Sequence, residues 1–143
     1  MPVEGIPEFD TALDEMVAKV NEAALEFVKR GAEIIKDEAQ KNLDGNSVST
    51  WRSDSWPHAT NRSNNLKNSI YMDSARMTGE GMAESTTGPH IIYARRIELG
   101  YHGSGQFPYF TTRAFPYFRP GVESARPKLD ALFAETVRAA QEA

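Results

Sequence analysis

A long apolar stripe in the first third of the chain constrains the fold most. Its members recur at steps of three, four or seven: Leu13, Val17, Val20, Ala24, Phe27, Ile34 and Ile35. This spacing is typical of one face of an α-helix. Asp10 or Thr11 can cap its start, with Asp14 completing a capping-box-like pattern. The Asp-Gly-Asn sequence at residues 44–46 can stop it after Leu43. Such a helix is about 50 Å long, too long for the chain's own strands to cover, which indicates a neighbouring subunit.

Gly31 lies inside this stripe. A glycine within a helix costs about 1 kcal/mol relative to alanine. A partner packed closely against Gly31 could offset that cost, so the sequence predicts a close helix contact here.

Two segments flank the helix. Residues 1–9 contain two prolines and are expected to form a lead that is flexible or docked on a neighbour. Residues 44–65 form a long polar loop, rich in Ser and Asn, that carries Trp51 and Trp56. Loops of this length are uncommon in compact domains unless they are functional or disordered. The two tryptophans can fold back as a satellite cluster or anchor a partner surface, and the sequence favours neither.

A β-hairpin is expected next. Ser63 can start a short helical turn, after which Ile70 and Met72 alternate with Tyr71 and Asp73, a period of two. A turn signal follows at residues 78–81, and residues 82–87 read as the returning strand, closed by Gly-Pro at positions 88 and 89.

A second amphipathic helix is expected from about Phe118 to Glu142. Its apolar face is formed by Val122, Ala125, Leu129, Leu132, Phe133 and Val137. Pro127 lies inside the pattern and predicts a kink or a break there. The chain is therefore expected to fold as one α+β domain over residues 1–143, with the long N-terminal helix and the C-terminal helix packed on a small antiparallel β-sheet.

The stretch from Tyr93 to Leu132 holds the most specific residues. It begins YARRIELG, which we interpret as about two turns of helix ended by Gly100 with a positive φ. Aromatic residues crowd the part that follows: Tyr101, Phe107, Tyr109, Phe110, Phe115, Tyr117 and Phe118. Pro108, Pro116 and Pro120 remove backbone donors and limit strand pairing, and Pro120 suits the first turn of the last helix. A catalytic motif would place nucleophiles, acids or metal ligands at close spacing. Aromatic rings, prolines and arginines around a turn instead indicate a role in packing.

These residues resemble a known family. YARRIELG, then a Gly-rich loop, then FPYFRPGVESARPKLDALF is similar to the pattern of the small head-to-tail joining (neck) proteins of long-tailed bacteriophages, of the tail completion or tail terminator type. That pattern has a Tyr-Ala, a Glu two residues before a Gly, and a Pro-aromatic-hydrophobic-Arg-Pro that opens the terminal helix. SNNLKNSI at residues 63–70 is similar to a further family segment, although Asn64 and Asn65 stand where Thr-Gly or Ser-Gly is usual. Gly121 likewise replaces the usual Ala.

The resemblance implies a structural virion protein and no enzyme, metal or cofactor. It implies a ring in the neck that joins or terminates the tail tube, most simply a hexamer of heterologous contacts, assembled in the cytoplasm of a host bacterium. Its partners would be further copies of itself, adjoining neck proteins and the tail tube protein, while DNA passes without specific binding. The residues then expected at interfaces are Trp51, Trp56, Tyr93, Glu98, Phe107, Phe110, Arg113, Phe115, Phe118 and Arg119.

Carboxylates of the first helix are candidates for the wall of such a channel. Genome DNA must slide through any neck ring, so its lumen should be acidic or neutral. The candidates are Glu15, Glu22, Glu26, Glu33, Asp37 and Glu38. A solvated helix face explains the same residues.

Composition agrees with this interpretation. A chain of 143 residues suits one domain with a modest core. Sixteen Lys and Arg against twenty Asp and Glu give a net charge of −4, so no overall basic charge favours nucleic-acid binding. The absence of cysteine excludes disulfides and thiolate chemistry. No apolar run is long enough to cross a bilayer, and the N-terminus lacks the pattern of a signal peptide.

A metal-dependent hydrolase is one alternative. Glu98 lies four residues before His102, and His90 is nearby, but Gly100 separates the first two, so their spacing fixes no coordination geometry. Glu98 is more simply structural: it can be held by Arg95, Arg113 or Arg119, or accept backbone donors near the glycine turn.

Single-stranded nucleic-acid binding is the other alternative. Two arginines, Arg113 and Arg119, interleave with the rings of Phe110, Phe115, Tyr117 and Phe118, a mixture that single-strand binders use for stacking. The acidic balance of the chain disfavours phosphate binding.

Overall fold

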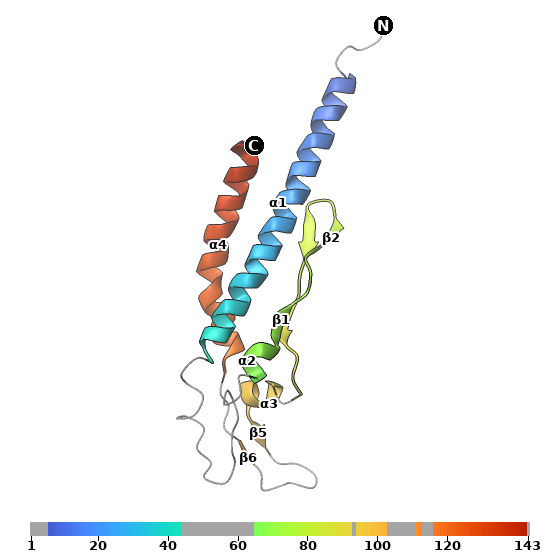
Figure 1. The fold of residues 1–143 in the computed structure, drawn as a ribbon. Coiled ribbons are helices and arrows are strands. Elements are labelled where there is room, and N and C mark those ends of the chain that lie inside the picture. Colours follow the sequence, from blue (N-terminus) through green and yellow to red (C-terminus); the bar gives the residue numbers. More distant parts are fainter. Residues whose placement is uncertain (1–5, 44–64, 93, 103–110, 113–115, 143) are drawn as a thin grey trace.

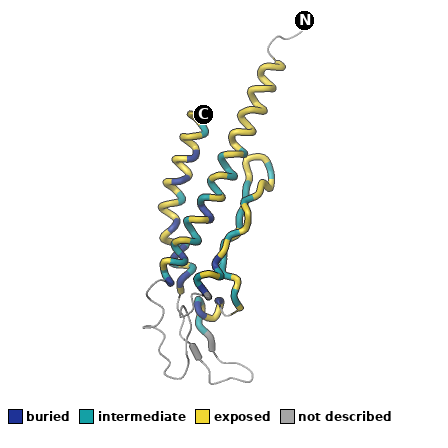
Figure 2. Tube along the Cα trace, in the orientation of Figure 1, coloured by how far each residue is buried: buried dark blue, intermediate teal, exposed yellow. Residues whose placement is uncertain are grey.

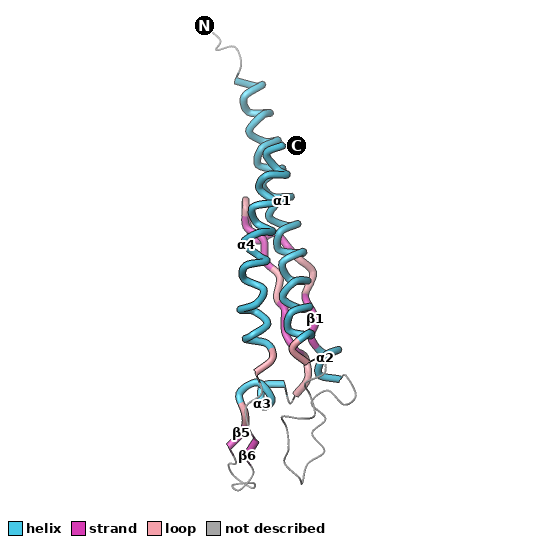
Figure 3. Tube along the Cα trace, turned by 90° about the vertical axis from the view of Figure 1, so that its left-hand side faces the viewer, coloured by secondary structure: helices cyan, strands magenta, loops and turns pink. Residues whose placement is uncertain are grey.

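The long helix α1 (Ile6–Lys41) is the axis of the molecule (Figure 1). A computed structural model describes residues 6–43, 65–92, 94–102, 111–112 and 116–142. The other elements are α2 (Asn65–Ser69), β1 (Ile70–Met72), β2 (Arg76–Gly79), β3 (Met82–Glu84), β4 (Thr87–Pro89), α3 (Ala94–Leu99), β5 (Tyr101–His102), β6 (Thr111–Thr112) and α4 (Phe118–Glu142). Helix α4 lies along one side of α1 and the β1–β4 hairpin along another (Figures 1 and 3). The predicted α+β class, with two helices and a small antiparallel β region, is confirmed.

Helix α1 begins earlier than the sequence signals indicated. Residues 6–9, expected in a flexible lead, are helical, and Asp10 and Thr11 lie within the helix rather than at its cap. The hydroxyl of Thr11 donates to the carbonyl of Pro7 at 2.9 Å, one turn back. Pro7 is compatible with this start because the first turn of a helix lacks internal partners for its N–H groups.

The β region is one long hairpin plus a short separate pair. In the hairpin β1 pairs with β4 and β2 with β3, both antiparallel, and β5 pairs with β6 elsewhere. The turn lies at residues 80 and 81, where Gly81 has φ +67°. The expected hairpin is therefore present, but Gly88 and Pro89 belong to β4 instead of closing it. Pro89 fits because, among the described residues, β4 pairs on one side only, and proline is tolerated in such edge strands.

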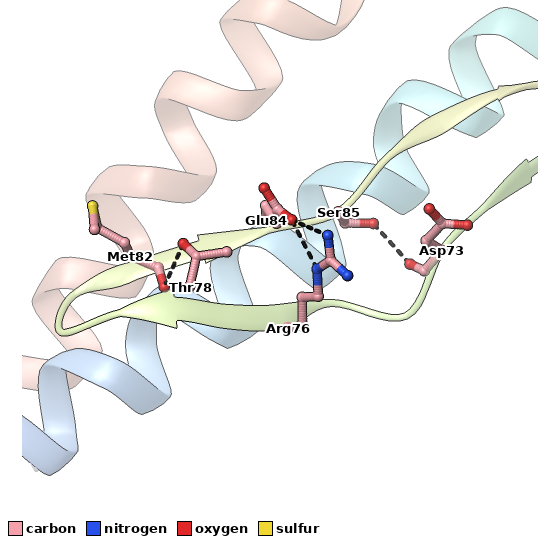
Figure 4. A network of polar contacts seen from close by, with 6 residues as sticks. All are labelled: Asp73, Arg76, Thr78, Met82, Glu84 and Ser85. Atoms are coloured by element: carbon pink, nitrogen blue, oxygen red, sulfur yellow. Dashed lines mark hydrogen bonds and ion pairs between the residues drawn. The ribbon is translucent and has the colours of Figure 1, made fainter.

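Polar contacts join the two arms of this hairpin (Figure 4). Arg76 lies directly across from Glu84 in the β2–β3 register, and the two side chains form an ion pair. The hydroxyl of Ser85 donates to the carbonyl of Asp73 at 2.8 Å. The hairpin tip is fixed to the long helix, because the Gly81 N–H donates to Asn21 Oδ1 at 2.7 Å.

Helices α1 and α4 approach closely at two glycines. A Cβ built on Gly31 would lie 3.1 Å from Leu129 Cδ2, so the close partner expected at Gly31 is present and is α4. At Gly121 the approach is tighter: a Cβ would lie 2.7 Å from the Cα of Ala39. Helix α4 also runs unbroken through Pro127, so the predicted break is wrong. The buried side chains of Ala125 and Leu132 on either side hold the helix in place and offset the one missing hydrogen bond.

The core lies at one end of the molecule, where the C-terminal end of α1, α2, β1, α3 and the start of α4 meet (Figure 2). Its buried members are Ala39, Leu43, Leu66, Ile70, Ala94, Ile97 and Tyr117. Asn42 Nδ2 donates to the Tyr117 carbonyl at 2.9 Å, and Gln40 Nε2 to the Lys67 carbonyl at 3.1 Å. The other end of α1 projects away from this core with every residue from Ile6 to Val20 exposed.

Candidate functional site

Glu98 joins the two segments that carry the family resemblance. Its Oε2 accepts the N–H groups of Tyr117 and Phe118 at 2.8 and 2.9 Å, and its Oε1 accepts that of Arg119 at 2.9 Å. These donors open α4, where N–H groups have no partner within the helix and a negative charge opposes the positive helix end. Pro120, next in line, has no N–H to satisfy. The expectation that Glu98 is structural and accepts backbone donors is confirmed, but the donors are Tyr117 and the first two residues of α4 rather than the turn at Gly100.

Gly100 ends α3 as expected. Its φ is +76°, a conformation that glycine adopts without strain. It ends the helix that carries Glu98, and the Ala94 and Ile97 side chains of the same helix are buried in the core. Glu98 is thereby fixed on a rigid element that faces the start of α4.

Seven of the ten proposed interface residues lie outside the described part of the chain. They are Trp51, Trp56, Tyr93, Phe107, Phe110, Arg113 and Phe115. Of the remaining three, Glu98 and Phe118 are half-buried at the core, with Phe118 packed against it. Arg119 is exposed and lies 3.6 Å from the Glu123 carboxylate, one helical turn on.

The structure describes the side chains of two of the three residues of the metal alternative, Glu98 and His90, while that of His102 lies outside the described part of the chain. Both oxygens of Glu98 accept hydrogen bonds from the first residues of α4. The His90 ring stacks on Tyr71, with 3.6 Å between ring centroids, and its Nδ1 lies 3.1 Å from the Gly88 carbonyl oxygen. Across the described ranges, no three His, Asp or Glu side chains come together in a way that could hold a metal ion.

One aromatic ring proposed for stacking in the nucleic-acid-binding alternative is inaccessible. Tyr117 is fully buried in the core, so its ring cannot receive a nucleic-acid base. Phe118 is half-buried beside it. Phe110, Arg113 and Phe115 are outside the described residues.

The carboxylates proposed for a channel form one exposed line on α1. Glu15, Glu22, Glu26 and Glu33 are all exposed and follow one another at steps of seven, four and seven, which places them on one helix face. Asp37 continues the line four residues later. Glu38 does not belong to it, because it lies a further 100° or so around the helix, where Lys128 of α4 holds its carboxylate.

The Glu38 ion pair predicts a pH dependence of stability. The hydrogen bond from Lys128, and then that from Lys41 at 3.2 Å, lower the pKa of Glu38 below its ordinary value of 4.5. The same contact raises the pKa of Lys128 above 10.5. The contribution of Glu38 is therefore present above pH 4.5 and is lost as the pH falls through its lowered pKa. That of Lys128 is present below pH 10.5 and is lost as the pH rises through its raised pKa.

We expect Glu38→Gln to lower the melting temperature by a few degrees between these limits. The difference from the unsubstituted protein should shrink at both extremes of pH, as measured by thermal unfolding followed by circular dichroism. A difference that stays constant from acid to alkaline pH would contradict a role for the ion pair.

A second candidate surface is the apolar stripe on the projecting part of α1. Ile6, Leu13 and Val20 repeat every seven residues, with Phe9 and Met16 between them, the spacing of a helix face built to pack on another helix. All are exposed, Phe9 by 63% and Met16 by 62%. The apolar stripe expected from the sequence began at Leu13, but Ile6 and Phe9 continue the same period towards the N-terminus.

This stripe leads into an apolar groove of about 640 Å³. Its floor is α1 (Ala12, Met16, Val20 and Ala23), one wall is α4 (Phe133, Val137 and Ala140), and the hairpin tip adds Gly81. Phe133 packs edge-on against Phe27 with ring centroids 5.5 Å apart, yet remains 57% exposed. Glu15, Lys19, Thr136 and Gln141 add polar side chains to this mostly apolar lining.

Comparison of the chain with protein-family models, with curated proteins and with solved structures found no match. The resemblance to phage neck proteins stays a prediction from the motifs quoted above. Neither of the long helices in the described part of the chain has a stretch apolar enough to span a lipid bilayer.

Proposed function

We propose that this protein is a structural component of a tailed bacteriophage, forming a ring in the neck that joins the head to the tail or terminates the tail tube. The observation that carries the proposal is the uncovered apolar stripe of α1. Exposed apolar surface of this extent usually marks an interface. A subunit that leaves its longest helix half uncovered is suited to assembly rather than to independent catalysis.

The geometry of the motif residues supports the same proposal. Glu98 accepts a backbone N–H at the start of α4 and so stabilises that end of the helix. Tyr117, just before α4, is buried in the core. Their role is to fix the angle between the core and the two long helices. This is the role expected of a scaffold for joining subunits.

The line of carboxylates on α1 fits the wall of a DNA channel. In a ring whose subunits turn this face inward, Glu15, Glu22, Glu26 and Glu33 would line the lumen with negative charge. Like charge keeps duplex DNA from adhering to the wall and lets it slide. A solvated outer face remains the competing explanation, and a ring lumen lined by Lys or Arg would contradict the proposal.

The test is assembly of the purified protein. We expect a mass that rises with concentration towards a closed oligomer, and negative-stain images that show rings with a central opening. The proteins encoded by the flanking genes should be added in parallel, because a ring can depend on a neighbour. Flanking genes for capsid, portal and tail tube would support the assignment. A monomer at every concentration, with those partners present, would overturn it.

A further inference from the structure

The projecting part of α1 lies next to the apolar groove between α1, α4 and the hairpin tip. Residues 6–15 form a ridge that carries Ile6, Phe9 and Leu13 of the exposed apolar stripe. The groove begins where that ridge ends, since Met16 and Val20 belong to the stripe and also line the groove. Each copy therefore has an exposed apolar helix face and, beside it, an apolar groove that can hold the helix face of another copy.

From this geometry we infer that the N-terminal segment of α1, residues 6–15, of one copy packs into the groove between α1, α4 and the hairpin tip of a second copy. The inference rests on the proposed ring and names the contact that would build it. Each copy donates its ridge to one neighbour and receives the ridge of the other, which is a heterologous contact that can close into a ring.

The apolar part of the groove suits an amphipathic helix. Alanine, valine, methionine and phenylalanine side chains make up much of the floor and walls, and Glu15, Lys19, Thr136 and Gln141 add polar groups beside them. An amphipathic helix binds such grooves through apolar residues at steps of three, four and seven. Ile6, Phe9 and Leu13 have such steps.

Charge favours contact between ridge and groove over contact between two ridges. The ridge is acidic on both flanks, with Asp10 and Asp14 on one and Glu8 and Glu15 on the other. Two ridges side by side would bring these carboxylates together and repel. The exposed surface of α4 carries both acidic and basic residues, so it repels an acidic ridge less than a second ridge would.

The size of the contact explains why a ring would be needed. Half of the lateral surface of a 10-residue helix is about 240 Å², so one ridge in one groove buries about 480 Å² in total. Stable pairs of proteins bury about 1,200–2,000 Å². A single contact is too small for a lasting dimer, whereas a closed ring gives every copy two contacts and no free end.

Cysteine cross-linking can test the contact directly, because the chain has no cysteine of its own. Two single-cysteine proteins, Phe9→Cys and Val137→Cys, are made with different masses, mixed at high concentration and oxidised. Since each carries one thiol, a Phe9–Val137 disulfide can form only between copies. We expect roughly tenfold more of this product than from Glu33→Cys mixed with Val137→Cys, since Glu33 is exposed on another face of α1. Equal yields from the two mixtures would overturn the inference.

The double variant Phe9→Cys/Val137→Cys separates this inference from the proposed function. A ladder of cross-linked products that ends in a closed oligomer supports both. A cross-linked dimer with no larger product supports the ridge-and-groove contact but overturns the ring. Rings seen in images without any Phe9–Val137 cross-link overturn the contact and leave the proposed function standing. Phe9→Glu gives an independent measurement: it should abolish assembly while leaving the circular dichroism spectrum unchanged, and assembly that persists would overturn the inference.

Discussion

Replacing Gly121 by leucine should separate the base of α4 from α1 and lower the free energy of unfolding by at least ~3 kcal/mol. A Cβ at this position would lie 2.7 Å from the Cα and 2.8 Å from the N of Ala39, and 3.1 Å from the carbonyl carbon of Glu38. These are backbone atoms inside α1, so they cannot rotate away as a side chain would. Even Gly121→Ala should cost about 2 kcal/mol, although alanine favours a helix. Urea unfolding monitored by circular dichroism measures both effects.

Two other glycines provide matched controls for Gly121. Gly31→Ala would meet only the flexible end of Leu129 at 3.1 Å, so relief of the helix cost of about 1 kcal/mol should leave stability near its starting value. Gly88→Ala meets nothing within 4 Å and should be nearly neutral. If Gly121→Ala were as stable as these two, the close approach of α1 and α4 at Ala39 would be wrong.

Glu98→Gln should lower the free energy of unfolding by about 2–4 kcal/mol, because three backbone N–H groups at the start of α4 lose a charged acceptor. The glutamine side chain has the same size, but its NH2 group is a hydrogen-bond donor and would face backbone N–H groups that are donors as well. The melting temperature should fall by roughly 10 °C. Hydrogen exchange should quicken first at the amides of Tyr117, Phe118 and Arg119.

Glu123→Gln is the control for this second prediction. It removes an exposed carboxylate near the start of α4 that lies 3.6 Å from Arg119. Exposed pairs of this kind contribute about 0–1 kcal/mol. Equal losses in the two variants would mean that general charge near the helix end matters rather than the hydrogen bonds of Glu98.

The sequence predicted most of the elements because each has a local cause. The apolar period of α1, the glycine that ends α3 and the Gly-rich hairpin turn all act within a few residues, and all are present in the structure. Local signals also misled: the capping pattern at Asp10 and Thr11 lies inside α1, and Pro127 does not interrupt α4. In both places helix geometry and packing over many residues outweigh one preferred cap or one missing donor.

The candidate site was less predictable, because its contacts join residues far apart in the chain. Glu98 could be interpreted as structural from its neighbours, but its donors lie about twenty residues on, at the start of α4. Gly121 appeared only as a departure from the alanine usual in neck proteins. The approach of Ala39 supplies the reason, because there is no room for a Cβ.

The sequence alone therefore determined the helices, the hairpin and the turn glycines, since hydrogen bonding and side-chain period act locally. Tertiary structure decided which faces were covered. The apolar stripe of α1 is continuous in the sequence, and only the place where α4 and the hairpin end divides it into a buried half and an exposed half. Burial depends on what other segments reach in space, and that is why the surface proposed for assembly became visible only in the folded chain.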